Sequence, residues 1–169
     1  CIVQLSQEEK FIEILNSIDV KSCVFLETFS NNEQKANSEF DRLTEIISKH
    51  KAQSILQLGI SPHSIYNVHA HFWKLISQYS LECDILIHTH LAESLEEIKW
   101  LKEGCSGIDI LHRTVGWDKL YPFEIGLNPV DYLEKLEILN KNLITAHLNK
   151  LSENDFEKLA KYRVNAALC

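Results

Sequence analysis

The chain is poor in the residues that mark several classes of protein. Its 169 residues include no methionine, only 5 glycines and only 3 prolines, which excludes a fibrous or low-complexity chain. No uninterrupted apolar stretch approaches the ~20 residues that span a bilayer. Glu8, Glu9 and Lys10 interrupt any apolar core of a signal peptide. We therefore expect neither a membrane protein nor a secretory leader at the start of this sequence.

Paired cysteines and excess positive charge are also lacking. The five cysteines are scattered without a CxxC pair, which predicts reduced thiols in a cytoplasmic protein and argues against a zinc-thiolate site. The formal net charge of −7 argues against a nucleic-acid-binding surface. The apolar fraction of 45% and the charged fraction of 24% are those of an ordinary folded domain.

Short apolar runs alternate with segments of helical spacing along the whole chain. This alternation predicts an α/β fold of parallel βα units. The strands are apolar nearly throughout, as expected when helices cover both faces of the sheet. About five strands form either an open doubly wound sheet or part of a barrel. The strands are expected at 20–26, 54–60, 84–91, 143–148 and 164–168, the helices at 7–18, 32–50, 68–79, 95–102, 129–139 and 152–162, and an irregular stretch at 104–127.

Three of the expected strands carry a histidine near the end or just after it. These residues are His63, His90 and His147. In parallel α/β folds the carboxyl ends of the strands meet at one edge, where catalytic groups gather. Each histidine alone is more simply a hydrogen-bonded structural residue. Three at equivalent places favour a shared metal site built from separate strands.

The segment from His90 to Glu93 is the most specific motif in the sequence. His90 can ligate a divalent metal ion while Glu93 reaches a water bound to that ion and carries its proton. The alternative is that Glu93, with Glu96 and Glu97, forms a negative first helical turn and a solvated face. His88 alternates with His90 in the strand, so both face the same side. His88 is therefore a second ligand, a supporting residue or a substrate contact.

The remaining histidines are expected outside the site. His69 and His71 lie in a helical pattern, where residues i and i+2 point apart, and are interpreted as surface or helix-packing residues. His50 and His112 have no partner in the sequence pattern and are interpreted as surface or structural residues. Glu27 ends the first expected strand and is either a pocket residue or a salt-bridged carboxylate.

Four motifs resemble the amidohydrolase superfamily, in its branch of chlorohydrolases and deaminases of adenosine-like nucleosides, aminofutalosine and related heterocycles. They stand in the order SPHSIY at 61–66, IHTHLAES at 87–94, TAHL at 145–148 and VNAALC at 164–169. The segment GLNPVDYL at 126–133 also resembles the piece that precedes the second metal-histidine strand of these enzymes. The resemblance covers nearly the whole chain.

The resemblance implies a distorted TIM barrel with one divalent metal ion, zinc or iron. It implies that His90 and His147 are metal ligands and that Glu93 shuttles protons. It also implies that His63 contacts the substrate or polarises the developing tetrahedral centre. The reaction it implies is hydrolytic release of ammonia from an amino-substituted heterocycle or nucleoside, a small-molecule substrate. The alternatives are a chlorohydrolase or amide hydrolase of the same superfamily, or a non-catalytic α/β module. The sequence leaves the oligomeric state open, with a homodimer as one alternative.

The sequence also departs from the family pattern. It lacks the family's HxH on the first barrel strand and the aspartate on the last strand. A (β/α)8 barrel needs eight strands and typically ~250 residues. We therefore expect residues 1–169 to be the central portion of one (β/α)8 catalytic domain, roughly its third to seventh strands, and to be inactive alone.

Overall fold

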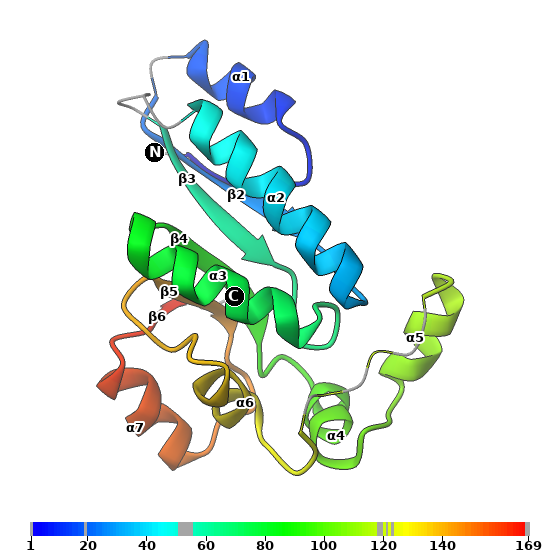
Figure 1. The fold of residues 1–169 in the computed structure, drawn as a ribbon. Helices are drawn as coiled ribbons and strands as arrows, with labels where there is room; N and C mark the ends of the chain where they lie inside the picture. The colour runs from blue at the N-terminus through cyan, green and yellow to red at the C-terminus, as the bar shows by residue number, and fades with distance from the viewer. Residues whose placement is uncertain are drawn as a thin grey trace.

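One parallel β-sheet organises the molecule. The computed structural model describes residues 2–18, 20–50, 56–117, 120, 122 and 124–167. Within them, six strands pair in chain order and every pair is parallel. The sheet curls into part of a barrel (Figure 1), which confirms the predicted α/β class and incomplete barrel. The strands are β1 (Ile2–Ser6), β2 (Ser22–Thr28), β3 (Leu56–Pro62), β4 (Leu86–Leu91), β5 (Leu143–His147) and β6 (Asn165–Ala167).

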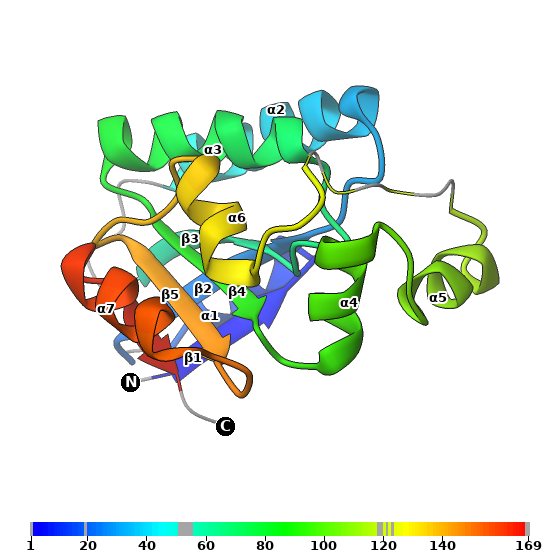
Figure 2. The same ribbon diagram turned by 90° about the horizontal axis from the view of Figure 1, so that it is seen from below.

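Helices connect the strands and cover the outside of the sheet. Helices α2 and α3 lie side by side along it, and α5 extends away from the rest of the chain (Figures 1 and 2). None of the helices in the described part of the chain has the length and apolarity needed to cross a membrane. The helices are α1 (Lys10–Asn16), α2 (Glu33–His50), α3 (Ala70–Cys83), α4 (Leu95–Glu103), α5 (Ile108–Thr114), α6 (Pro129–Lys135) and α7 (Glu153–Lys161).

Side chains at the helix starts explain where several helices begin. Ser94 accepts a hydrogen bond from the backbone N–H of Glu97 at the start of α4. Ser152 and Asp155 form a reciprocal capping box at the start of α7. Asn128 caps α6, and Pro129 occupies its first turn. Such caps satisfy N–H groups that have no partner inside the helix, and each contributes ~1 kcal/mol. They place α4 and α7 directly after β4 and β5.

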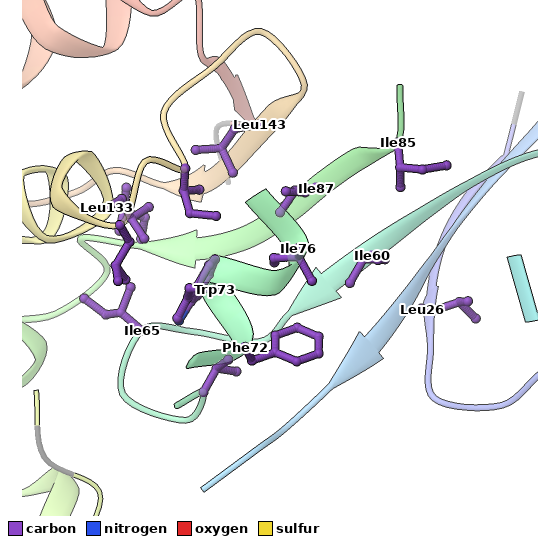
Figure 3. Packing of buried hydrophobic residues seen from close by; sticks show 14 of the residues in the cluster. Leu26, Ile60, Ile65, Phe72, Trp73, Ile76, Ile85, Ile87, Leu133 and Leu143 are labelled. Carbon is purple, nitrogen blue, oxygen red and sulfur yellow. The ribbon is translucent and has the colours of Figure 1, made fainter. Parts of the chain in front are cut away.

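The core includes buried residues of α1, α2, α4 and α6, and a central part of it lies between the sheet and α3. Phe72, Trp73 and Ile76 of α3 are fully buried, and they point toward Ile60 of β3 and Ile87 of β4 (Figure 3). A large apolar side chain of this kind contributes ~1.5–3 kcal/mol when it is fully buried. This packing fixes α3 against the two strands whose carboxyl ends bear His63 and His90.

The structure contains two elements, β1 and α5, that the sequence did not predict. The strand β1 was not expected, yet it pairs with β2 from Ile2↔Ser22 to Ser6↔Leu26. Its run, IVQLS, is interrupted by Gln4, and its Val3 and Leu5 side chains are exposed, so it lacks the continuous buried pattern expected of a strand covered on both faces. Helix α5 lies in the stretch expected to be irregular. It has seven residues, and its N-cap Gly107 offers no side-chain hydrogen bond, so the usual start signal is missing.

Several element ends also differ, among them those of α1, which spans Lys10–Asn16 where 7–18 was expected, and of α3, which spans Ala70–Cys83 where 68–79 was expected. Helix α6 was expected to reach residue 139 but ends at Lys135. Glu137 has φ 59°, a left-handed conformation that a helix cannot continue through. The last strand was expected at 164–168 but begins at Asn165 and extends to Ala167, while Leu168, its last predicted residue, lies outside the described part of the chain.

Candidate active site

The predicted site residues gather at the carboxyl edge of the sheet. His63 follows β3 directly, His90 lies one residue before the end of β4, and His147 is the last residue of β5. Glu93 stands two residues after β4, just before the cap of α4. Parallel strands bring these ends together because all of them run in the same direction.

These four residues lie close to one another. The ring centroids of His90 and His147 lie 5.2 Å apart, and the rings are tilted by 30°. Nε2 of His147 lies 3.7 Å from Oε1 of Glu93. The His63 ring is 4.6 Å from the His90 ring. The four side chains therefore form a row along the barrel edge, in the order His63, His90, His147 and Glu93, each in contact with the next.

The geometry of His90 suits a metal ligand. Its Nδ1 lies 2.8 Å from the carbonyl oxygen of His63. A carbonyl oxygen only accepts, so Nδ1 carries the proton and the lone pair remains on Nε2. This is the usual way in which a protein orients a metal-ligating histidine. Among the described residues no group of three or more ligating side chains is assembled, so His90 and His147 are at most part of a ligand set.

The backbone is strained where the site residues emerge. Ala92, His147 and Leu148 have φ values of 52°, 75° and 57°. Residues with a Cβ adopt this left-handed region at a cost of ~1–3 kcal/mol each. Such strain persists where surrounding contacts hold it, and it concentrates at functional sites. Both turns that carry His147 and Glu93 share this feature.

Glu97 is buried under the Glu93 turn, which corrects the prediction of a solvated acidic face. Only 1% of Glu97 is exposed, and it accepts hydrogen bonds from the backbone N–H groups of Ala92 and Glu93, both at 2.9 Å. Burial raises the pKa of Glu97 to about 7, against the opposing effect of these bonds. The Ser94-x-x-Glu97 spacing resembles a capping box and was the signal available for this role.

His63 lies in a network of aromatic and amide side chains. Its ring stacks on Phe29 at 4.7 Å, and Phe29 also contacts Trp117 at 5.9 Å. Asn67 bridges two histidines, with Nδ2 3.2 Å from Nδ1 of His63 and Oδ1 3.4 Å from Nε2 of His112. Burial and the neighbouring His90 lower the pKa of His63. His63 is therefore held as a neutral ring in a fixed orientation.

Sequence reasoning did not find Phe29, Asn67 and Trp117. Asn67 and Phe29 follow strands β3 and β2 in loops, and Trp117 lies beyond α5. For Phe29 and Asn67, the only signal in the sequence was their position after a strand. No spacing pattern marked Trp117.

His88 faces the same region from inside the sheet. Nδ1 of His88 lies 3.1 Å from the hydroxyl of Ser61, and its ring contacts Phe25 and His90 at 5.5 and 5.6 Å. Burial, together with the other histidines, lowers the pKa of His88 to about 4. His88 is thus a neutral side chain beside the candidate site.

The other histidines have structural partners. His69 caps α3, where its Nδ1 accepts from the backbone N–H of His71, and Nε2 of His71 lies 2.9 Å from Asn37 of α2. His50 is buried and lies 2.8 Å from Glu9. Glu27 is partly exposed and accepts from Gln7. None of these contacts involves His63, His90 or His147.

The partial parallel barrel and the histidine–glutamate group at its carboxyl edge are typical of hydrolases of the amidohydrolase superfamily. No family model matches the chain. Among curated proteins, the 5-methylthioadenosine/S-adenosylhomocysteine deaminase of Pyrococcus horikoshii is 30% identical over 136 residues, which are 80% of this chain and 27% of that protein. The 5'-deoxyadenosine deaminase of Methanospirillum hungatei is 32% identical over 114 residues, 68% of this chain and 21% of that protein.

Solved structures show the same fold. The aminofutalosine deaminase of Helicobacter pylori matches with a TM-score of 0.78 and 17% identity over 97% of this chain and 40% of its own. A zinc-bound adenosine deaminase from Xanthomonas campestris matches with a TM-score of 0.68 and 16% identity over 94% of this chain and 32% of its own. The predicted relationship to deaminases of the amidohydrolase superfamily is therefore confirmed. The chain spans about a quarter of the length of these curated relatives.

Proposed function

We propose that the chain is the central part of a metal-dependent hydrolytic deaminase that acts on an amino-substituted heterocycle or nucleoside. Adenosine-like compounds and aminofutalosine are the substrate class, as in the named relatives. The observation that carries the proposal is the convergence of His90, His147 and Glu93, with 5.2 Å between the imidazole rings and 3.7 Å from His147 to Glu93.

His90 and His147 would hold the metal ion. Neutral imidazoles suit zinc and iron alike, and the zinc-bound adenosine deaminase among the similar structures supports a divalent ion. When bound, the ion lowers the pKa of a water molecule toward ~7 and so supplies a nucleophile at neutral pH. The remaining ligands would come from other strands of the barrel, because the described part of the chain provides six strands and a closed barrel has eight.

Glu93 would move the proton that deamination requires. It takes a proton from the attacking water and delivers it to the departing amino group, so that the water oxygen replaces nitrogen and ammonia leaves. Its carboxylate lies at the rim beside His147 and is partly exposed, which leaves it accessible to a substrate.

His63 would contact the substrate ring. Asn67 and Phe29 fix its orientation, and its lowered pKa keeps it neutral at pH 7. A neutral imidazole offers one donor and one acceptor to a heterocycle without introducing a charge.

The chlorohydrolase alternative has less support. A triazine-type chlorohydrolase is among the structures of similar fold, at 13% identity, whereas the more similar curated proteins are deaminases. Loss of ammonia also requires a proton donor to the leaving group, which Glu93 supplies. We further propose a cytoplasmic enzyme with a small-molecule substrate and without nucleic-acid or membrane partners, on the charge and cysteine pattern of the sequence.

The Glu93→Gln variant of the full-length protein tests the proposal. Glutamine keeps the size of the side chain but cannot carry a proton at neutral pH. We expect kcat for ammonia release from adenosine-like compounds to fall ~10²-fold or more. Metal content should stay near wild type, and the free energy of unfolding should change by less than ~1 kcal/mol.

Two further variants complete the test. His90→Ala should remove the metal together with the activity. Glu96→Gln removes an exposed carboxylate from the same helical turn and should leave kcat unchanged. A Glu93→Gln enzyme that turns over normally but melts early would show that Glu93 is only a helix-start charge.

A further inference from the structure

Both carboxylate oxygens of Glu97 are used on the turn that carries Glu93. Oε1 accepts from the N–H of Ala92 and Oε2 from the N–H of Glu93, each at 2.9 Å. These are consecutive peptide groups, and the acceptor is almost fully buried. Burying a carboxylate is costly unless its oxygens are satisfied. The neighbouring Glu96, by contrast, is exposed, and its carboxylate accepts from the backbone N–H of Gly107 rather than from the Ala92–Glu93 turn.

The opposite side of the same turn is tied to the loop after β5. The N–H of Lys150 donates to the carbonyl of Ala92 at 3.0 Å, and Nδ2 of Asn149 donates to the carbonyl of Glu93 at 3.3 Å. The turn is therefore held from α4 on one side and from the His147 loop on the other. Ala92 sits in the left-handed region at φ 52°, so these bonds oppose a tendency of the turn to relax.

We propose that Glu97 is a positioning residue, which locks the Ala92–Glu93 turn and thereby holds the Glu93 carboxylate opposite His147. The inference rests on the proposed function, because it assigns Glu97 an effect on the proton transfer performed by Glu93. The N–H groups of Ala92 and Glu93 need two acceptor oxygens on a side chain as long as that of glutamate. Glutamine has the reach but only one oxygen, and its NH2 group would face a backbone donor. Aspartate has two oxygens but is shorter by one methylene.

The Glu97→Gln variant of the full-length protein tests this role. A misplacement of about 1 Å in a reacting group lowers turnover by up to ~10²-fold. We expect kcat to fall ~10-fold to 10²-fold with little change in KM, since Glu97 contacts no substrate. The amide protons of Ala92 and Glu93 should exchange faster than in the wild type, which reports the loss of the two bonds independently of activity. Metal content should be unchanged.

A double-mutant cycle separates positioning from a general structural role. Once Glu93 can no longer transfer a proton, its placement no longer matters. Glu97→Gln should therefore lower kcat no further in the Glu93→Gln background, while it still speeds exchange of the two amide protons. Glu96→Gln is the matched control on the same helix, and it should change neither kcat nor this exchange.

The outcomes distinguish the two proposals. If Glu93→Gln leaves kcat unchanged, the proposed function fails and the role of Glu97 fails with it. If Glu93→Gln lowers kcat but Glu97→Gln does not, only the positioning role is overturned. The positioning role is also overturned if the effects of the two substitutions on kcat multiply in the double variant, because Glu97 would then act independently of Glu93.

Discussion

Replacing Gly59 with alanine would force one methyl group against the two neighbouring strands of the sheet. Gly59 lies in β3 between Phe25 of β2 and Leu86 of β4. A Cβ at this position would meet the Phe25 ring at 2.5 and 2.6 Å and the Leu86 carbonyl oxygen at 2.9 Å. Carbon atoms in contact prefer ~3.5–4.0 Å, so the Phe25 ring must move by about 1 Å, while the Leu86 carbonyl oxygen needs a smaller shift.

Neither neighbour moves freely. Phe25 is only 3% exposed and packs against the ring of His88, and the Leu86 carbonyl is part of the β4 backbone. Forcing extra atoms into a packed core costs about 1–3 kcal/mol. We expect Gly59→Ala to lower the free energy of unfolding by about that amount, measured by urea unfolding of the full-length protein.

Two comparisons sharpen the Gly59 test. Phe25→Leu removes the ring atoms that clash, so it should cost less in the Gly59→Ala background than in the wild type. Gly107→Ala places its Cβ 3.0 Å from the flexible end of Glu96 and should change stability by less than ~0.5 kcal/mol. A Gly59→Ala protein as stable as the wild type would refute the packing described for this sheet.

Two further predictions concern buried polar groups. Burial raises the pKa of Glu97 from 4.5 to about 7, so the native chain keeps a proton that the unfolded chain has lost. The free energy of unfolding should therefore fall by up to about 3 kcal/mol as pH rises from 4.5 to 7. Urea titrations of Glu97→Gln should lack this pH dependence. An equal pH dependence in the wild type and the variant would contradict the raised pKa of Glu97. Asn67→Ala leaves the buried His112 without its Asn67 partner, which should cost ~1–3 kcal/mol in the same assay. It also frees the His63 ring, so KM should rise, and an unchanged KM would exclude His63 as a substrate contact.

The long periodic segments of the chain were predictable because their patterns are local. The spacing of Leu43, Ile46 and Ile47 marks the inward face of α2, and all three are buried. Caps such as Ser152 act through the next three residues, so their signal lies in the sequence itself. Five of the six strands follow from apolar runs between such helices.

The sequence by itself determined the alternation of strands and helices and the order of His63, His90, Glu93 and His147. Tertiary structure alone decided that β1 is a strand, because pairing with the edge of β2 satisfies a backbone whose side chains Val3 and Leu5 stay exposed. It also decided that Glu97 is buried and Glu96 exposed. Both are acidic residues in one helical turn, and only the packing of the Ala92–Glu93 turn against α4 provides the two N–H donors that make burial of a carboxylate tolerable.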